Sequence, residues 1–241
     1  MDGDYDSMAY EAIIFDMDGV LVERTPSHVF DTSVDAAFGA CGVTEPESDD
    51  YELLRDSAQE LSAHADRFNK RYGIDVGELW EKRQEHMLRG QLDAMRNGEK
   101  NVYDDVEIIE SLQHELAVVS NNQSGAVEEI LRYYGIDNRV ETWSGIDPRI
   151  EELRHRKPNP RNIIETLDKL DAGAGLYVGD KEKDVLAAKN AGVDSAIIRR
   201  DFNAEQSFDV RPTYDLDSLE ELIEIAETGR PSDSDRSSKP H

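Results

Sequence analysis

The sequence predicts an α/β protein in which helices cover a parallel sheet and a further helical segment is inserted after the first strand. Four short apolar segments, each followed by polar or glycine-rich residues, have the pattern of buried strands. Segments of helical spacing separate the last three of these strands. Residues 27–113, between the first and second strands, contain no convincing strand and are far too many for an ordinary connection.

The strands and helices of the sheet can be placed from these patterns. The strands are predicted at residues 11–15, 116–120, 175–179 and 195–200. The helices between them are predicted at residues 124–134, 160–170 and 182–191. Strands that alternate with helices are joined by right-handed crossovers, so the sheet should be parallel with helices on both faces. The stretch TYDLDSLEELIEIAE then predicts a short extended piece and a final amphipathic helix.

The inserted segment is expected to form a helical domain over residues 25–98, with helices near 28–40, 51–70 and 76–95. The glycine and asparagines of RNGEKNVYDD suit a return hinge. We therefore expect the core domain to comprise the two ranges on either side, and we expect a disordered tail because the last residues are polar and rich in Ser and Pro. The predicted core ranges are 1–24 and 99–228, and the predicted tail is 229–241.

The charge of the chain argues against some classes of partner. It carries 53 acidic and 27 basic residues, for a formal net charge of −26. Such a surface repels nucleic acid and anionic membranes, so neither is an expected partner. Only 9 of the basic residues are lysines, a composition that suits a protein kept hydrated in concentrated salt. We take halophilic origin as a hypothesis, beside the simpler alternative of an acidic cytoplasmic protein.

Cysteine usage and hydropathy point to a soluble protein of the cytoplasm. Cys41 is the one cysteine, so no disulfide can form within the chain, and its small-residue surroundings suggest packing rather than reactivity. The first ten residues lack a basic and apolar targeting pattern, and no apolar run is long enough to span a bilayer. The sequence leaves open whether the protein is a monomer or a weak dimer.

Chemically capable side chains follow three of the predicted strands. The stretch AIIFDMDGVLV places two carboxylates directly after a buried strand, where unpartnered charges are costly. Ligands bind open parallel sheets at the carboxyl ends of the strands, so these side chains should meet at one edge. They are Asp16 and Asp18, then Ser120, Asn121 and Asn122, then Asp180 and Asp184, with Lys157 before the helix that leads to the strand at 175–179.

These residue types fit phosphoryl transfer. A carboxylate can attack phosphorus to form an aspartyl-phosphate, and a second carboxylate can act as general acid and then as general base. A carboxylate that approaches a phosphate dianion needs countercharge, which an oxygen-ligated Mg²⁺ supplies. Lys157 would neutralise further charge, and Ser120 with nearby backbone N–H groups would donate hydrogen bonds to the phosphoryl oxygens.

The same residues resemble the motifs of a known family. The sequence is similar to the four ordered motifs of the haloacid dehalogenase-like hydrolases at DMDGV (16–20), SNN (120–122), KPNP (157–160) and GDKEKD (179–184). The resemblance covers residues 11–22 and about 100–227, and the helical insertion lies where that family carries its small cap domain. It implies a Rossmann-like parallel core with an α-helical cap.

The resemblance also implies roles for individual residues. Asp16 would be the nucleophile and a Mg²⁺ ligand, and Asp18 would be the acid/base, with its backbone carbonyl on the metal. Ser120 and Lys157 would bind the phosphoryl group, together with Asn121. Asp180 would be a metal ligand, and Asp184 would complete or orient the metal shell.

The expected function is Mg²⁺-dependent hydrolysis of small phosphate monoesters under a cap that excludes bulk water. Sugar phosphates, phosphoglycolate and nucleoside monophosphates remain candidates, and the phosphoglycolate phosphatase and β-phosphoglucomutase branches look most similar. The dehalogenase branch resembles the chain less, because it lacks the second carboxylate that Asp18 supplies. Two alternatives stay open: a phosphomutase, and a non-catalytic binding protein, which would be expected to have lost one of Asp16, Asp18, Lys157 or Asp180. All four are present.

Each candidate residue also has a purely structural interpretation. The two motif-one aspartates could cap a helix, Ser120 and Asn121 could form a turn, Lys157 could be a loop lysine beside Arg154 and Arg156, and Asp184 could stabilise a helix start. Motif one continues as LVERTPSH, which departs from the family pattern and puts Glu23 and Arg24 at the hinge. The inserted segment's basic residues are expected to be solvated, namely Arg24, Arg55, Lys70, Arg71 and Arg89.

Overall fold

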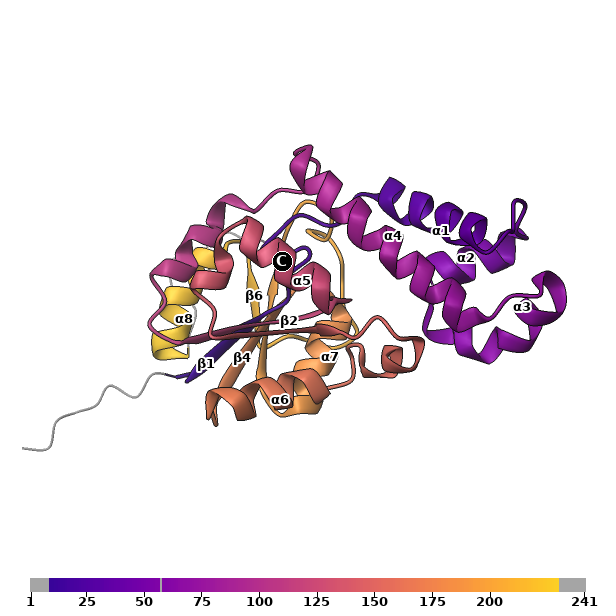
Figure 1. Cartoon of the computed structure of the whole chain (residues 1–241). Helices are drawn as coiled ribbons and strands as arrows, with labels where there is room; N and C mark the ends of the chain where they lie inside the picture. Colours follow the sequence, from indigo (N-terminus) through magenta and orange to yellow (C-terminus); the bar gives the residue numbers. More distant parts are fainter. Residues whose placement is uncertain (1–8, 57, 230–241) are drawn as a thin grey trace, which may run out of the picture.

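A computed structural model of the chain describes residues 9–56 and 58–229. Its centre is a six-stranded parallel sheet in the order β3-β2-β1-β4-β5-β6, flanked by helices (Figure 1). This confirms the predicted α/β class. The predicted disordered tail lies outside the described residues except for Gly229. The strands are β1 Ala12–Phe15, β2 Glu115–Gln123, β3 Thr142–Ile146, β4 Gly175–Gly179, β5 Asp194–Ile198 and β6 Tyr214–Leu216.

The central strand β1 is apolar throughout because both of its faces are buried. Ile13 and Phe15 point into one apolar cluster, which helices α5 (Ser124–Tyr133) and α8 (Leu222–Thr228) cover. Ala12 and Ile14 point to the other face, which is covered by α6 (Arg161–Leu170) and α7 (Glu182–Ala191). The two-residue alternation of strand side chains therefore fills both layers of the core.

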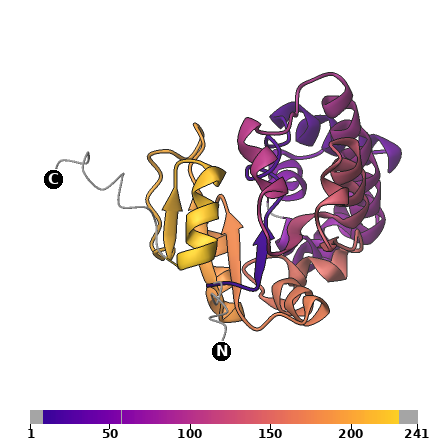
Figure 2. The ribbon, with the colours of Figure 1, turned by 90° about the vertical axis from the view of Figure 1, so that its left-hand side faces the viewer.

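The inserted segment forms helices that pack on one another beyond the edge of the sheet (Figures 1 and 2). They share an apolar cluster of their own, centred on Phe38, Phe68, Leu79 and Trp80. The predicted single helix over 51–70 is wrong, because a 3₁₀ segment divides it. The elements are α1 Ser27–Ala40, α2 Ser48–Asp56, η1 Ala58–His64, α3 Ala65–Tyr72 and α4 Val76–Arg96.

The strand predictions need correction at several points. Strand β3 was not predicted at all, since TWSGI lies at the edge of the sheet, is mostly half-buried and contains a glycine. Strand β2 continues to Gln123, so the SNN motif lies within the strand rather than after it. A register shift between Val119 and Gln123 bends this end of β2. The strand predicted at 195–200 runs from Asp194 to Ile198.

Short 3₁₀ segments complete the chain. They are η2 Asp104–Glu110, η3 Ile136–Asn138, η4 Ile150–His155 and η5 Leu219–Glu221. Segment η4 connects the sheet domain to the inserted helices, because its residues Ile150 and Leu153 pack in the apolar cluster of those helices. Within the described ranges, no helix is both long and apolar enough to cross a membrane.

Candidate active site

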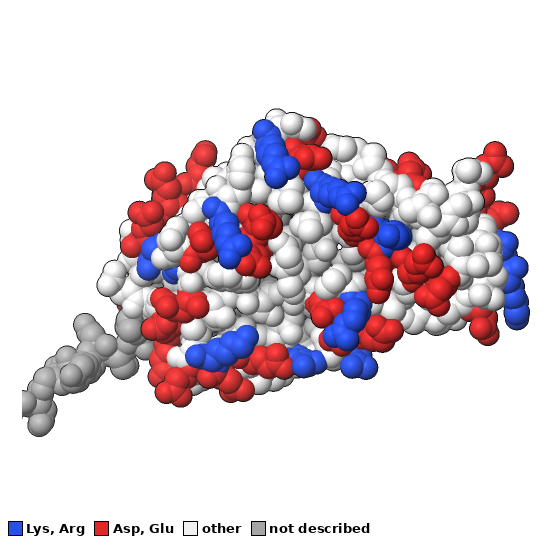
Figure 3. All heavy atoms as spheres, viewed as in Figure 1, with Lys and Arg blue, Asp and Glu red and all other residues white. Residues whose placement is uncertain are grey.

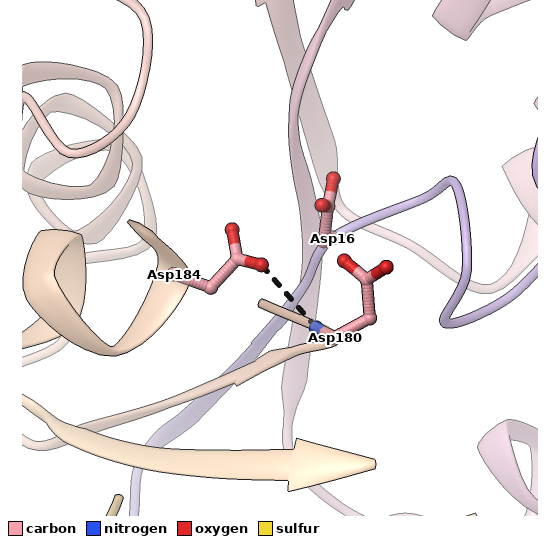
Figure 4. A group of neighbouring side chains, drawn as sticks. All are labelled: Asp16, Asp180 and Asp184. Carbon is pink, nitrogen blue, oxygen red and sulfur yellow. Dashed lines mark hydrogen bonds between the residues drawn. The ribbon is translucent and has the colours of Figure 1, made fainter. Parts of the chain in front are cut away.

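Three buried carboxylates meet at the carboxyl edge of the sheet (Figure 4). Asp16 directly follows β1, Asp180 directly follows β4, and Asp184 lies in the first turn of α7. One oxygen from each lies within 4.8 Å of the others. Parallel neighbouring strands β1 and β4 end side by side, which is why residues so distant in the sequence come together here.

Lys157 supplies a buried positive charge to this group. Its Nζ lies 2.9 Å from Asp16 Oδ2 and 2.8 Å from Asp184 Oδ1. It also donates to the Tyr177 hydroxyl at 2.6 Å and to the Val119 carbonyl at 3.3 Å. Burial alone would lower the pKa of Lys157, but the charges of Asp16 and Asp184 raise it well above its ordinary value. The lysine therefore stays charged and is fixed in place.

The same contacts keep Asp16 ionised. Burial acts to raise the pKa of Asp16, but the charges of Lys157 and Lys183 overcome it and lower the pKa below its ordinary value. One carboxylate oxygen accepts the backbone N–H of Met17 at 2.8 Å, and the other faces Lys157. Asp16 is thus an anion at neutral pH, as a carboxylate nucleophile must be.

Asp180 is the carboxylate whose two oxygens both accept no hydrogen bond. Neither of its oxygens has a hydrogen bond, although it is fully buried, and Lys181 Nζ lies 3.4 Å from Oδ2. Burial raises the pKa of Asp180 to about 7, with Asp16 and Asp184 adding to the shift and Lys181 opposing it. Unsatisfied buried carboxylate oxygens beside two further carboxylates fit the ligand set that Mg²⁺ prefers.

Two glycines leave room for this arrangement. Gly19 has a φ of +90°, and a Cβ there would lie 2.5 Å from Asp180 Oδ2. A Cβ on Gly179 would collide with the Asp184 side chain. Asp184 Oδ2 also accepts the backbone N–H groups of Asp180 at 3.2 Å and Lys181 at 3.0 Å, which closes the loop before α7. Side chains larger than glycine would therefore displace the carboxylates.

The residues of the SNN motif have different roles in the site. Asn121 holds the backbone of Lys157, since its Oδ1 accepts the Lys157 N–H at 2.7 Å and its Nδ2 donates to the Lys157 carbonyl at 3.3 Å. The Ser120 hydroxyl accepts the Asn122 N–H at 3.2 Å and lines the cavity. Asn121 thus positions the lysine loop here, while Ser120 remains available to a ligand.

Asp18 lies apart from the three-carboxylate group and belongs to a network that the sequence did not reveal. Its Oδ1 accepts a short hydrogen bond from Lys100 Nζ, and its Oδ2 accepts one from Asn122 Nδ2 at 2.9 Å. Lys100 is fully buried and also contacts Thr25 Oγ1 at 2.9 Å and Gln91 Oε1 at 3.2 Å. Gln91 lies on α4, so the network joins Asp18 to the inserted helices.

The segment that contains Lys100 stands out in the sequence, but its composition predicts a hinge rather than a buried lysine. Lys100 lies in RNGEKNVYDD, whose glycine and asparagines predict a hinge. The lysine lies four residues after the end of α4 and contacts Asp18, which follows β1. Gln91 is a second signal, because it is one of three polar residues on the buried side of α4, with Arg83 and Gln84.

A cavity of about 630 Å³ opens above these carboxylates. Core residues Asp16, Asp18 and Ser120 line it together with side chains of the inserted segment. Of the basic residues expected to be solvated, Arg24 is exposed and Arg55 is half-buried, and both also line the cavity. Lys70, Arg71 and Arg89 do not line it.

Comparisons with known proteins agree on the type of enzyme that the chain resembles. A model of the haloacid dehalogenase-like hydrolases matches residues 13–198. Phosphoglycolate phosphatase of Vibrio parahaemolyticus is 29% identical over 223 residues, which cover 88% of this chain and 94% of that protein. Pyrophosphatase PpaX of Halalkalibacterium halodurans is 24% identical over 234 residues, covering 90% and 97%.

A solved structure shows the same fold. CbbY from Rhodobacter sphaeroides, in complex with phosphate, superposes with a TM-score of 0.65 at 21% sequence identity. The superposition covers 88% of this chain and 96% of that one. The shared fold therefore includes the inserted helices as well as the sheet.

Proposed function

The chain belongs to the haloacid dehalogenase-like hydrolases, and from this premise we propose that it is a phosphatase of small phosphate monoesters that works through an aspartyl-phosphate on Asp16. One observation carries the proposal. An ionised Asp16 faces the cavity, and Lys157 and two further carboxylates surround it. The relatives named phosphoglycolate phosphatase and pyrophosphatase support the reaction class.

In the first step, an Asp16 oxygen attacks the phosphorus of the bound ester, and the bond from phosphorus to the alcohol oxygen breaks. Asp18 gives its proton to the departing alkoxide. In the second step, Asp18 takes a proton from a water molecule, which attacks the phosphorus and breaks the bond to Asp16. Lys157 and Ser120 would hold the phosphoryl oxygens, and Asn121 would hold Lys157 in position.

We assign the metal site to Asp16, Asp180, Asp184 and the backbone carbonyl of Asp18. The unpartnered oxygens of Asp180 support this assignment, since a buried carboxylate without donors is otherwise costly. A bound Mg²⁺ would offset the negative charge that builds up when a carboxylate meets a phosphate group. Lys157 provides the remaining positive charge from the protein itself.

The inserted helices are proposed to act as a cap, with residues 25–98 as its extent. The network of Asp18, Lys100 and Gln91 supports this idea, because it connects the proposed acid/base to helix α4. A cap that carries Gln91 would deliver this side chain to the Asp18 network only when closed, which would couple closure to proton transfer.

The direct test is phosphate release from a panel of small phosphate monoesters, with Mg²⁺ or with EDTA, at low and at high KCl. We expect metal-dependent release of inorganic phosphate from at least one ester. Isomerised sugar phosphate without net phosphate would favour the phosphomutase instead. Folded protein that gives neither product would favour a binding protein that retains the fold.

The raised pKa of Asp180 predicts how Mg²⁺ stabilises the protein. Without metal, the folded protein keeps a proton on Asp180 that the unfolded chain releases between about pH 4 and pH 7. Stability of the metal-free protein should therefore fall as the pH rises through this range. Because protons compete with the metal, the Mg²⁺-induced rise in Tm should be larger near pH 8 than near pH 5. Calorimetry of wild type and Asp180→Asn at pH 5 and pH 8 checks this, and a wild-type rise that is equal at the two pH values would contradict it.

The acidic surface predicts a dependence on salt. Acidic side chains outnumber basic ones on the chain, and in the view of Figure 3 they spread over both the sheet domain and the inserted helices. Their mutual repulsion is screened at high ionic strength. If the protein works in a salt-rich cytoplasm, its thermal midpoint should rise strongly between low and molar KCl. An unchanged midpoint would contradict halophilic origin.

A further inference from the structure

The cavity is strongly basic, although the chain as a whole is acidic. Six cationic side chains line it, and two of these are neutralised by nearby carboxylates. Arg55 lies 2.6 Å from Asp31 and 2.6 Å from Asp56. Lys181 lies 3.4 Å from Asp180. The other four are Arg24, Arg83, Arg156 and Lys183, and no ion pair forms at any of them within residues 9–56 and 58–229.

Arg83 on α4 is the most deeply buried of these unpaired arginines, at 7% exposure. Its Nη1 donates to the neutral Gln84 Oε1 at 2.8 Å, and its Nε has no partner. The guanidinium also lies over the Trp80 ring, 5.1 Å from the centroid. Burial, followed by repulsion from Arg156, lowers the pKa of Arg83 to about 10, so the side chain is still charged at neutral pH.

Arg156 approaches the same cavity from the core. It follows η4, the segment that packs against the inserted helices, and it directly precedes Lys157. Its backbone is extended, with φ −64° and ψ 145°, so neighbouring side chains point in different directions. Lys157 points to Asp16, while Arg156 lines the cavity with an unpartnered Nε. Burial lowers the pKa of Arg156.

Two guanidinium groups that repel each other in a partly buried cavity are unfavourable unless an anion lies between them. We propose that Arg83 and Arg156 bind a second anionic group of the substrate, a carboxylate or phosphate carried by the alcohol that leaves. The planar fork of arginine matches both groups through paired N–H donors. This proposal rests on the proposed function and names the class of ester that the site selects.

The position of Arg83 along α4 sets the length of that ester. Asn122 lines the cavity beside Asp18 and donates to Gln91 of α4, and Arg83 lies eight residues earlier than Gln91 on the same helix. Eight residues of α-helix correspond to about 12 Å along the axis. A ligand that reaches both ends therefore needs a chain of several carbon atoms. Phe30, Met87 and Ile146 give the cavity apolar lining for that chain.

The kinetic test uses three phosphate monoesters of equal chain length, whose far end is a methyl, a carboxylate or a phosphate group. Wild type should prefer a charged end. In Arg83→Met and Arg156→Met, the ratio of kcat/KM for the charged ester over the methyl ester should fall at least about tenfold. Arg83→Lys should restore part of the ratio. The matched control is Arg89→Met, since Arg89 is exposed on α4 and pairs with Glu85, and its ratio should equal that of wild type.

A binding test needs no turnover. Isothermal titration of wild type and Arg83→Met would use an alkylphosphonate, a phosphonocarboxylate and a bisphosphonate of that chain length, whose C–P bonds are not ester bonds. The charged second group should strengthen binding to wild type, and Arg83→Met should abolish the gain. The larger of the two gains identifies carboxylate or phosphate as the natural group. If wild type hydrolyses no ester, the proposed function is wrong. The titration still tests the anion site in that case, because it measures binding without turnover. A wild type without the gain, or an Arg83→Met protein that keeps it, overturns the inference.

Discussion

Asp16→Asn is expected to lower the rate of phosphate release by at least about 10³-fold, because an amide cannot form the aspartyl-phosphate. The substitution keeps the size of the side chain and one of its oxygens, so the fold and the cavity should survive. Substrate binding should weaken far less than turnover, since Lys157 and Ser120 remain. Steady-state kinetics with the best ester of the panel measures both effects.

A matched control separates loss of the nucleophile from a general effect of the substitution. Asp168→Asn makes the same chemical change at an exposed position on α6 and should leave kcat and KM unchanged. If Asp16→Asn retained more than about a tenth of the wild-type rate, a different nucleophile would have to be sought. Thermal unfolding of both variants verifies that each is folded.

Lys157→Met is expected to reduce both activity and stability. The substitution removes the ammonium that lies within 3 Å of Asp16 and Asp184, and it leaves their carboxylates buried without it. Breaking a buried ion pair in this way costs about 3–5 kcal/mol, which corresponds to a Tm lowered by roughly 6–20 °C. Loss of a preorganised charge at the phosphoryl group should lower kcat by about 10²–10³-fold.

Mg²⁺ provides an internal check on this result. A divalent cation bound by the same carboxylates should recover part of the stability that Lys157→Met loses, although not the rate. Lys169→Met, which removes an exposed lysine on α6, should change neither quantity. A Lys157→Met protein as stable and as active as wild type would show that the ammonium does not hold the carboxylates together.

The sheet was predictable because its strands are buried on both faces. A run such as AIIF is apolar throughout, and the helices between the later strands have clear spacing. Strand β3 was not predicted, because an edge strand is buried on fewer sides and its sequence is less apolar. The break in the helix predicted over 51–70 was also not predicted. Leu54, Leu61 and Phe68 recur every seven residues, as in one continuous helix, although they lie on separate elements.

The site was predictable where its residues stand at strand ends. Asp16 and Asp180 take their positions from β1 and β4, so parallel pairing alone brings them together. Lys157 lies in a loop, and its place beside Asp16 depends on Asn121. The resemblance implied that Asn121 binds phosphate and did not predict its contact with the Lys157 backbone. The roles assigned to these residues remain proposals.

Other parts of the site depend on contacts that no local pattern encodes. Lys100 reaches Asp18 across 82 positions of sequence, and this contact exists only because α4 returns the chain to the core. Arg83 looks like one more basic residue of an amphipathic helix until the fold brings it to the same cavity as Arg156. Charge repulsion between them appears only in three dimensions.

The most direct test of the central claim is chemical trapping of the aspartyl-phosphate during turnover. Borohydride reduces an acyl phosphate to the alcohol, so a phosphorylated Asp16 would become homoserine. Peptide mass spectrometry after quenching wild type with borohydride should find this change at position 16, with substrate and Mg²⁺ present and not without substrate. Reduction at another aspartate, or none while phosphate is being released, would contradict the mechanism.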